Sequence, residues 1–296
     1  MLTSQQQLFL GIDGGGSKCK AVILDAQMKC LGEGIAGAAN PFHSVEKAQK
    51  SIIDAALLAL ADAGLGEQQL SQLIAGVGLA GVNIPKYFDL MNAWQHPFQA
   101  MHLATDLHIA CLGAHNGENG AIMICGTGSV GYVSIDGASL IVGGHGFPQG
   151  DTCSGAWLGL QAVQKVLLAA DDLGAQTSLT ERIYHALDCS DSNDLVSQLC
   201  AQGATFYARL AIHVFDAADE GDLVAQQILA QASNYFTAVF HKLMAKDPAR
   251  ISLIGGLQVR LKDWLATDIF SQFSEPMQAP EIGAVLFARQ KTQSFT

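Results

Sequence analysis

Two glycine-rich turns, each placed directly after a strand-like run of apolar residues, constrain the fold of this chain more than any other feature. The first turn is Gly14-Gly15-Gly16-Ser17-Lys18, and the second is Gly126-Thr127-Gly128-Ser129. Another strand-like run follows each of them. A strand–turn–strand unit made of glycine, serine and threonine presents backbone N–H groups with no side chain in the way, which suits a phosphate chain.

This strand–turn–strand unit occurs twice, once in each half of the chain, with Gly14 and Gly126 lying 112 positions apart. This repetition predicts two domains that close on one nucleotide. A dinucleotide fingerprint or a P-loop fits less well, since both lead from a strand into a helix. The order Ser17-Lys18 also reverses the order in a P-loop. Each turn alone could equally be an ordinary hairpin.

Length and composition indicate a two-domain protein that buries much of its surface. The chain has 296 residues, of which 49% are hydrophobic and 15% charged. A net charge of −11 argues against a nucleic-acid partner. The sequence lacks a run of about 18 apolar residues and a signal-peptide pattern at residues 1–7, so we expect a cytoplasmic protein with no membrane partner. Seven cysteines without a CxxC pair are expected to be reduced and mostly buried.

The first part of the chain reads as a mixed sheet with helices on both faces. Ser44 is expected to cap the first helix, which ends before Gly64. The expected strands cover residues 8–13, 19–25, 29–36, 73–80 and 100–105, and helical patterns cover residues 44–63, 84–95 and 106–115.

A polar, glycine-rich segment at residues 116–120 precedes a restart of the pattern, and the chain after Asp151 becomes mostly helical. The longest helical pattern, 222–246, has Asp222 as its expected N-cap and an apolar stripe that indicates core packing. A short strand at 251–254 leads into Gly255-Gly256. We therefore predict domains at 1–115 and 116–280, with a C-terminal helix at about 281–292 that packs back on the first.

These motifs, in this order, resemble the sugar kinase, actin and heat-shock chaperone ATPase superfamily and, within it, the BadF/BadG-type ATPase and N-acetylglucosamine kinase family. The matching segments are the two glycine turns as phosphate loops and Leu253-Ile254-Gly255-Gly256-Leu257 as the adenosine segment. The resemblance covers nearly the whole chain. The resemblance implies an α/β fold of two ribonuclease-H-like (actin-like ATPase) domains, each a mixed sheet flanked by helices, with a nucleotide cleft between them.

The segment from Gly143 to Asp151 looks like that family's sugar loop, with two departures. The family usually shows Trp where this chain has His145. It also usually reads Gly-Asp-Glu-Gly-Ser where this chain reads Gly150-Asp151-Thr152-Cys153-Ser154. Asp151 is kept, so recognition of a sugar hydroxyl is still expected. The changed residues would lie near the second carbon of the sugar, so they are expected to influence which substituent at that carbon is preferred.

The resemblance also implies roles for single residues. ATP would be held through its phosphates by Gly14, Gly15, Gly16, Ser17, Lys18, Thr127, Gly128 and Ser129, and through its nucleoside by Gly255 and Gly256. Asp13 would support Mg²⁺, through water. Asp106 would be the catalytic base, which takes the proton of the attacking hydroxyl. The sugar would contact Asn40, Asp106, Gly144, His145, Gly146 and Asp151.

Plainer roles compete with these for the three aspartates. Asp106 and Asp151 each precede a helical pattern, where Asp most often serves as an N-cap. The residues alone favour the cap for Asp106. Asp13 could simply stabilise its turn. Among the histidines there is no HExxH pattern, so His102, His108 and His115 are not expected to bind zinc.

The implied function is ATP-dependent phosphorylation of N-acetylglucosamine at its 6-hydroxyl, by a homodimer. Glucosamine kinase is the alternative within the same class, because the sugar loop is changed. The family also contains ATPases that activate dehydratases or reductases through an iron–sulfur cluster, but such a cluster needs paired cysteines that the sequence does not show. A sugar-responsive repressor would need a basic extension before residue 8, which this sequence does not show either.

Overall fold

The chain forms two compact units, each with its own core. The computed structural model describes residues 7–293. The first unit runs to Gly120 and resumes at Pro276, and the second unit is Ala121–Glu275. The C-terminal segment therefore belongs to the same unit as the first glycine turn.

The first unit is built on a five-stranded mixed sheet in the order β3-β2-β1-β4-β5. Strands β1 to β3 form an antiparallel meander, and β4 and β5 continue the sheet parallel to β1. The strands are β1 (Leu8–Gly14), β2 (Cys19–Leu24), β3 (Cys30–Ala36), β4 (Leu73–Leu79) and β5 (Ala100–Thr105). The strands expected from the sequence are confirmed to within about a residue at each end.

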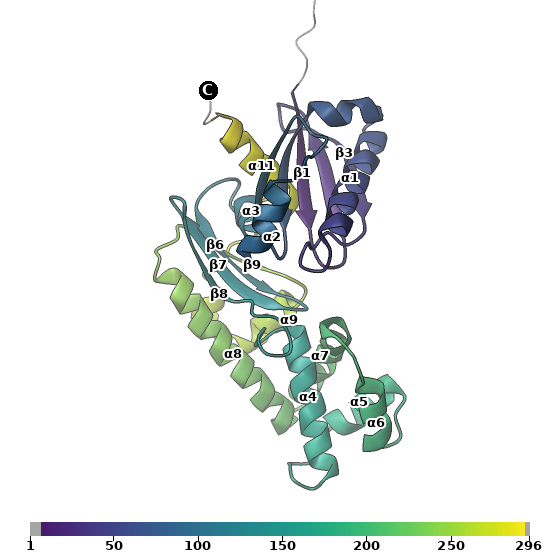
Figure 1. Cartoon of the computed structure of the whole chain (residues 1–296). Helices are drawn as coiled ribbons and strands as arrows, with labels where there is room; N and C mark the ends of the chain where they lie inside the picture. The colour runs from purple at the N-terminus through teal and green to yellow at the C-terminus, as the bar shows by residue number, and fades with distance from the viewer. Residues whose placement is uncertain (1–6, 294–296) are drawn as a thin grey trace, which may run out of the picture. The chain divides into compact units, whose positions relative to one another are not determined.

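Helices cover both faces of this sheet (Figure 1). One face packs on α1 (Val45–Asp62), which is followed by the short η1 (Glu67–Gln72) and, after β4, by α2 (Pro85–Asn92). The other face packs on α3 (Asp106–Ala114) and on α11 (Pro280–Gln293). The expected cap of the first helix is confirmed, because the Ser44 hydroxyl accepts a hydrogen bond from the Lys47 N–H at 3.1 Å.

Helix α11 lies directly on the backbone of the two central strands. A Cβ atom at Gly11 of β1 would stand 2.0 Å from the carbonyl oxygen of Glu281. At Gly76 of β4 it would stand 1.9 Å from the carbonyl oxygen of Ala284. Only glycine leaves room for this contact, so both strands are adapted to a helix that comes more than 200 positions later in the chain.

The second unit contains a four-stranded sheet in the order β8-β7-β6-β9. Its strands are β6 (Gly120–Cys125), β7 (Ser129–Ile135), β8 (Ala138–Gly143) and β9 (Ile251–Ile254). β8 pairs antiparallel with β7, and β9 pairs parallel with β6. The order repeats that of the first four strands of the first sheet, with a glycine turn after the corresponding strand.

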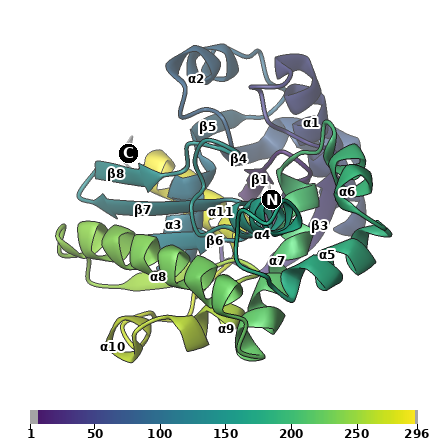
Figure 2. The ribbon, with the colours of Figure 1, turned by 90° about the horizontal axis from the view of Figure 1, so that it is seen from below.

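Helices make up the rest of the second unit. α8 lies along β7 and β8 (Figure 2) and buries Phe236, Phe240 and Leu243. The Asp222 carboxylate caps it by accepting from the Ala225 N–H at 2.9 Å, as expected. The helices are α4 (Gly155–Ala170), α5 (Leu179–Leu187), α6 (Ser192–Leu199), α7 (Ala204–Asp219), α8 (Leu223–Met244), α9 (Gln258–Leu261), η2 (Lys262–Trp264) and α10 (Thr267–Phe270). Within residues 7–293, no helix combines the length and apolar character needed to cross a bilayer.

Candidate functional site

The first glycine turn is a tight hairpin between β1 and β2 with an exposed tip. The Gly15 N–H donates to the Lys18 carbonyl at 2.9 Å, which closes the turn. Gly14 has no space for a side chain, because a Cβ there would stand 2.4 Å from a methyl group of Leu79. Gly16, Ser17 and Lys18 are exposed. The tip thus offers free space, a hydroxyl group and one ammonium group, as a phosphate chain requires.

Two aspartates of the first unit share one acidic cluster. Burial raises the pKa of Asp13, at the end of β1, to about 6, and the negative charges of Glu281 and Asp106 add to this shift. Lys18 and Lys20 oppose it. The pKa of Asp106 is also raised by burial, although a hydrogen bond from the Leu107 N–H at 2.9 Å works against the shift. Two half-buried carboxylates, one of which raises the pKa of the other, make a site that favours a cation.

Asp106 does not cap its helix, which corrects the reading that the residues alone favoured. The cap of α3 is Thr105, whose hydroxyl accepts from the His108 N–H at 3.1 Å. Thr105 satisfies the His108 N–H, and Asp106, one position later, accepts through one carboxylate oxygen from the Leu107 N–H of the first turn. The carboxylate therefore stays available beside Asp13 at the carboxyl ends of parallel strands, where open α/β sheets bind ligands.

Asn40 lies beside the first glycine turn. Its neighbour Ala39 donates its N–H to the carbonyl of Gly15 at 2.9 Å. The amide oxygen of Asn40 accepts from the Phe42 N–H at 2.9 Å and lies close to Gly81. The structure thus gathers Asp13, the turn, Asn40 and Asp106 into one group within the first unit.

The second glycine turn is held at its base by the N-terminus of α4. The carbonyls of Gly126 and Thr127 accept from the N–H groups of Gly155, at 2.8 Å, and Ala156, at 3.2 Å. Thr127 is exposed. Ser129 is buried, and its hydroxyl donates to the Thr152 carbonyl at 2.7 Å. The hydroxyl available for a ligand on this turn is therefore that of Thr127.

The turn that follows β9 lies against the second glycine turn. Gly255 has a φ of +120° and a Cβ there would stand 2.3 Å from the Cys125 carbonyl, so the position requires glycine. The same carbonyl accepts from the Leu257 N–H at 3.2 Å. The predicted adenosine segment and second phosphate turn are thus neighbours within the second unit.

Asp151 joins the loop after β8 to the second glycine turn. Its carboxylate accepts from the Gly146 N–H at 3.1 Å, and one carboxylate oxygen would lie only 2.7 Å from a Cβ at Gly128. Burial raises the pKa of Asp151, whereas its backbone hydrogen bonds and His145 lower it. The capping reading is wrong here as well, because Ser154 caps α4 by accepting from the Trp157 N–H at 3.1 Å.

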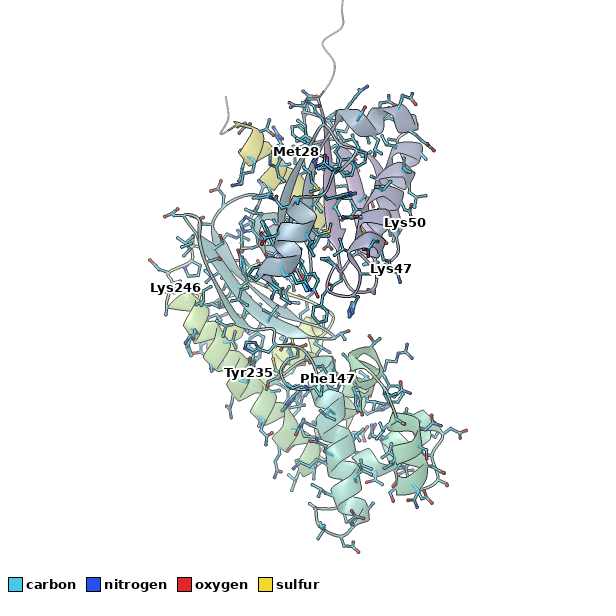
Figure 3. The ribbon with its side chains drawn as sticks, viewed as in Figure 1. Met28, Lys47, Lys50, Phe147, Tyr235 and Lys246 are labelled. Atoms are coloured by element: carbon cyan, nitrogen blue, oxygen red, sulfur yellow. The ribbon has the colours of Figure 1, made fainter. Side chains whose placement is uncertain are left out.

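The loop between Gly143 and Asp151 places its residues at the same end of the unit. Gly144 and Gly146 both have positive φ, at +69° and +83°, which glycine accommodates freely. His145 between them is exposed. Phe147, labelled in Figure 3, packs on α7, because its ring centroid lies 5.1 Å from that of Tyr207. The second unit thus gathers Thr127 to Ser129, Gly255-Gly256 and this loop into a second group.

Cys153 stands in a backbone conformation that favours glycine. Its φ is +70°, which explains physically why the related motif has Gly at this position. The residue is buried, and its carbonyl accepts from the thiol of Cys125 at 3.1 Å. Of the seven cysteines, four are buried and none forms a disulfide. The expectation of reduced, mostly buried cysteines is consistent with this distribution.

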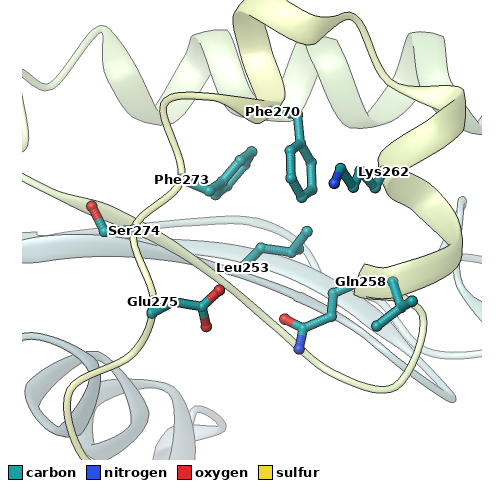
Figure 4. Close-up of a pocket in the computed structure, with 8 residues that line it drawn as sticks. Leu253, Gln258, Lys262, Phe270, Phe273, Ser274 and Glu275 are labelled. Carbon is teal, nitrogen blue, oxygen red and sulfur yellow. The ribbon is translucent and has the colours of Figure 1, made fainter.

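A pocket of about 340 Å³ opens beside the Gly255-Gly256 turn (Figure 4). Leu253 of β9 and the aromatic rings of Phe270 and Phe273 give it an apolar wall. Gln258, Lys262 and Glu275 supply polar groups at its edge. An apolar wall with a few polar groups is typical of a small-molecule site. The sequence did not indicate this pocket, because three separate segments form it.

Sequence reasoning also missed Lys20 and Glu281. The ammonium of Lys20 lies 2.7 Å from the carboxylate of Glu281, which is buried. A glutamate in the first turn of a helix normally faces solvent, so the pattern of α11 alone carries no signal for this contact. Among the described residues, no group of three or more His, Cys, Asp or Glu side chains converges with metal-ligand spacing.

Comparisons with known proteins show the family to which this chain belongs. The model of the BadF/BadG/BcrA/BcrD ATPase family matches residues 10–288. A glucosamine kinase from Vibrio cholerae is 35% identical over 280 residues, which cover 95% of each chain. An N-acetyl-D-glucosamine kinase from Dictyostelium discoideum is 29% identical over 206 residues, which cover 65% of this chain and 64% of that protein.

Solved structures give the same result. A crystal structure from Chromobacterium violaceum, of a protein assigned as an N-acetylglucosamine kinase, superposes with a TM-score of 0.87 at 29% identity. The match covers 96% of this chain and all of that one. The resemblance inferred from the motifs and the expected α/β fold are both confirmed. The chain belongs to the BadF/BadG/BcrA/BcrD ATPase family.

Proposed function

We propose that this protein is an ATP-dependent amino-sugar kinase that phosphorylates glucosamine at its 6-hydroxyl. N-acetylglucosamine, which the sequence placed first, becomes the second candidate. The observation that carries the proposal is the acidic pair Asp13 and Asp106 beside the exposed first glycine turn. The sugar-kinase class rests on the relatives from Vibrio cholerae and Chromobacterium violaceum, both of which match almost the full chain.

ATP binds, in this proposal, through the residues of both glycine turns. Gly14 to Lys18 and Thr127 to Ser129 supply N–H groups, hydroxyls and one cation to the phosphates. Gly255 and Gly256 let the nucleoside approach the backbone, and the apolar pocket beside them suits a flat, apolar base. The proton of the attacking hydroxyl passes to the carboxylate of Asp106, since phosphoryl transfer mainly needs a positioned nucleophile and neutralised charge.

Magnesium fits the residues that would hold it. Asp13 offers a hard carboxylate oxygen in an acidic, half-buried cluster whose charge a divalent cation would neutralise. When bound, Mg²⁺ would supply charge neutralisation for the phosphates. Homodimer formation and a cytoplasmic location are also part of the proposal. The first rests on the family resemblance, and the second on the composition of the sequence and its lack of a signal-peptide pattern at residues 1–7.

The sugar would lie against Asn40 and Asp106 of the first unit and against the loop with Gly144, His145, Gly146 and Asp151. The loop offers an exposed imidazole where relatives have an indole, and so no large apolar face for an acetyl group. Asp151 supplies a carboxylate to this loop, beside the backbone N–H of Gly146 and the imidazole of His145. This chemistry supports an ammonium group at the second carbon, and the 35% identity to a glucosamine kinase points the same way.

The dehydratase-activator alternative finds less support. An iron–sulfur cluster needs thiolates that several chains or loops bring together. The exposed cysteines Cys30 and Cys200 lie in different units, and four of the remaining five are buried. An ultraviolet–visible spectrum of anaerobically purified protein separates the two classes, because a cluster gives a brown colour.

An ATP-consumption assay over glucosamine, N-acetylglucosamine, glucose and N-acetylmannosamine tests the proposal directly. We expect glucosamine to give the highest kcat/KM, and NMR of the product to place the phosphate on the 6-oxygen. His145→Trp should shift the kcat/KM ratio toward N-acetylglucosamine by roughly tenfold, the scale of one apolar contact. The exposed His43→Trp variant serves as control. Preference for glucose, or ATP consumption independent of any sugar, contradicts the proposal.

A further inference from the structure

The outer edge of β8 presents backbone groups that the second sheet does not use. β8 is the last strand of this sheet and lies beside β7 (Figure 2). The Gly144 N–H donates to the Ser129 carbonyl of β7 at 3.1 Å. Because an antiparallel ladder alternates from residue to residue, the N–H and carbonyl groups of Ser139 and Ile141 point away from β7. Within residues 7–293, these outward groups make no backbone hydrogen bond.

Other strand edges of this protein are covered. At the opposite edge of the same sheet, the Ser274 N–H donates to the Ile251 carbonyl of β9 at 2.8 Å. At the β3 edge of the first sheet, the Glu33 N–H donates to the carboxylate of Asp62 at 2.9 Å. Proteins commonly cover or charge their strand edges in this way, because an open edge pairs with another strand.

β8 combines its open edge with an uncharged and apolar sequence. Residues 137–144 contain no charged residue and no proline, in a chain with a net charge of −11. The Ile141 side chain is 41% exposed, and Leu140 and Val142 are only half-buried. A hollow of about 330 Å³, with Leu140 in its wall, opens on the same hairpin. This edge therefore lacks the devices that keep strands apart.

We propose that β8 pairs antiparallel with β8 of a second copy of this chain, about a two-fold axis at Ile141. In this register Ile141 lies opposite its own counterpart, and Leu140 lies opposite Val142. Apolar side chains thus meet on both faces of the joined sheet, with no like charges opposed. The pairing also brings the Asp136 end of one strand to the His145 end of the other, so that a carboxylate meets an imidazole that can donate to it.

A second copy fits this edge better than an unrelated strand, because a two-fold contact needs a surface that is complementary to itself. A short, uncharged strand that pairs with its own counterpart meets this requirement. β8 ends at Gly143, where the loop proposed to bind the sugar begins, so the pairing would also hold the near end of that loop. The inference assigns an interface to the homodimer of the proposed function and rests on that part of it.

Sedimentation velocity of the full chain at several concentrations tests the inference. We expect the unmodified protein to form a dimer. Ile141→Lys places two ammonium groups opposite each other at the centre of the pairing, and should weaken dimer formation by roughly tenfold or more. Leu90→Lys is the matched control, because Leu90 is 46% exposed on α2 of the first unit. It should leave the dimer unchanged.

Residue-resolved hydrogen exchange of the unmodified protein locates the contact without depending on how a variant folds. The outward N–H groups of Ser139 and Ile141 should exchange slowly in the dimer and faster after dilution to the monomer. Those of Leu140 and Val142, which face β7, should stay protected in both states. Rapid exchange of the outward groups in the dimer overturns the inference, and so does a dimer that survives Ile141→Lys.

These results are separable from those that test the kinase. A protein that is monomeric at every concentration but consumes ATP in the presence of glucosamine removes the homodimer and this interface, and leaves the kinase standing. A β8-paired dimer that consumes no ATP with any sugar removes the kinase and leaves the interface standing.

Discussion

At the scale of single residues, the aspartates assigned to chemistry are available because neighbouring hydroxyl residues serve as helix caps. Thr105 caps α3 and Ser154 caps α4. Asp106 and Asp151 each stand within three positions of these caps and keep their carboxylates for other contacts. A cap accepts from an N–H two or three positions later, and only the backbone conformation decides which of several polar neighbours takes that place. For this reason the sequence could not separate the cap from the base.

Asp106→Asn should lower kcat by more than about a hundredfold, because an amide cannot accept the hydroxyl proton. Binding of ADP and sugar should change by no more than a few fold, since the amide keeps the shape of the side chain. Steady-state kinetics and calorimetry measure the two effects. Asp89→Asn, on the exposed surface of α2, is the control. Retention of more than about a tenth of kcat would reduce Asp106 to a structural residue.

Asp13→Asn should make the protein more stable at pH 8 while abolishing Mg²⁺-dependent nucleotide binding. The pKa of Asp13 is raised from 3.8 to about 6, so between these values the native state holds a proton that the unfolded chain has lost. Stability therefore falls as the pH rises from about 4 to about 6, and stays lower above that range. The Asn variant lacks this loss, which amounts to at most about 3 kcal/mol.

Urea denaturation at pH 5 and pH 8 measures this difference. The gain from Asp13→Asn should be larger at pH 8 than at pH 5. A variant that is less stable than the unmodified protein at both values would show that the Asp13 carboxylate stabilises the turn, as the plainer reading of the sequence has it.

At the scale of elements, the sequence predicted the strands and helix caps that interactions between neighbouring residues determine. The alternation and glycine punctuation of residues 8–36 gave three strands, and Ser44 and Asp222 cap the helices that they precede. The helices α5, α6 and α7 were foreseen only as a mostly helical region. Contacts between distant segments could not be predicted, because they give no local sequence pattern. Examples are the packing of α11 on Gly11 and Gly76 and the Lys20–Glu281 ion pair, whose residues lie far apart in the chain.

Gly76→Ala should destabilise the first unit by roughly 2–3 kcal/mol, because its methyl group would collide with the backbone of α11. The helix must move away from the sheet or the strand must bend. Gly16→Ala is the matched control, since no atom in the described part of the chain lies within 4 Å of a Cβ there, and its stability should change by less than about 0.5 kcal/mol. Equal urea midpoints for the two variants would mean that α11 does not pack on β4 in solution.

At the scale of the whole molecule, the chain repeats one sheet order and one glycine turn in two units with separate cores. A third hairpin shows what an ordinary turn looks like in this fold. Asp136 and Gly137 join β7 to β8 with φ values of +50° and +82°, the backbone of a tight two-residue hairpin. The glycine turns at residues 14–18 and 126–129 are longer and richer in hydroxyl groups. The Asp136-Gly137 hairpin can therefore serve as a control when phosphate binding by the two glycine turns is tested.

Hydrogen exchange with and without ADP, Mg²⁺ and glucosamine should show slowed exchange in both glycine turns. The reason is that each turn donates N–H groups to the phosphates in the proposed function, and a bound acceptor removes them from solvent. The Asp136-Gly137 hairpin, which has no proposed ligand, should exchange at an unchanged rate and serves as the internal control. Protection confined to residues 14–18 would show that the second turn is an ordinary hairpin and that one unit alone binds the nucleotide phosphates. Protection of both turns, with the control unchanged, is the result expected of a duplicated phosphate site.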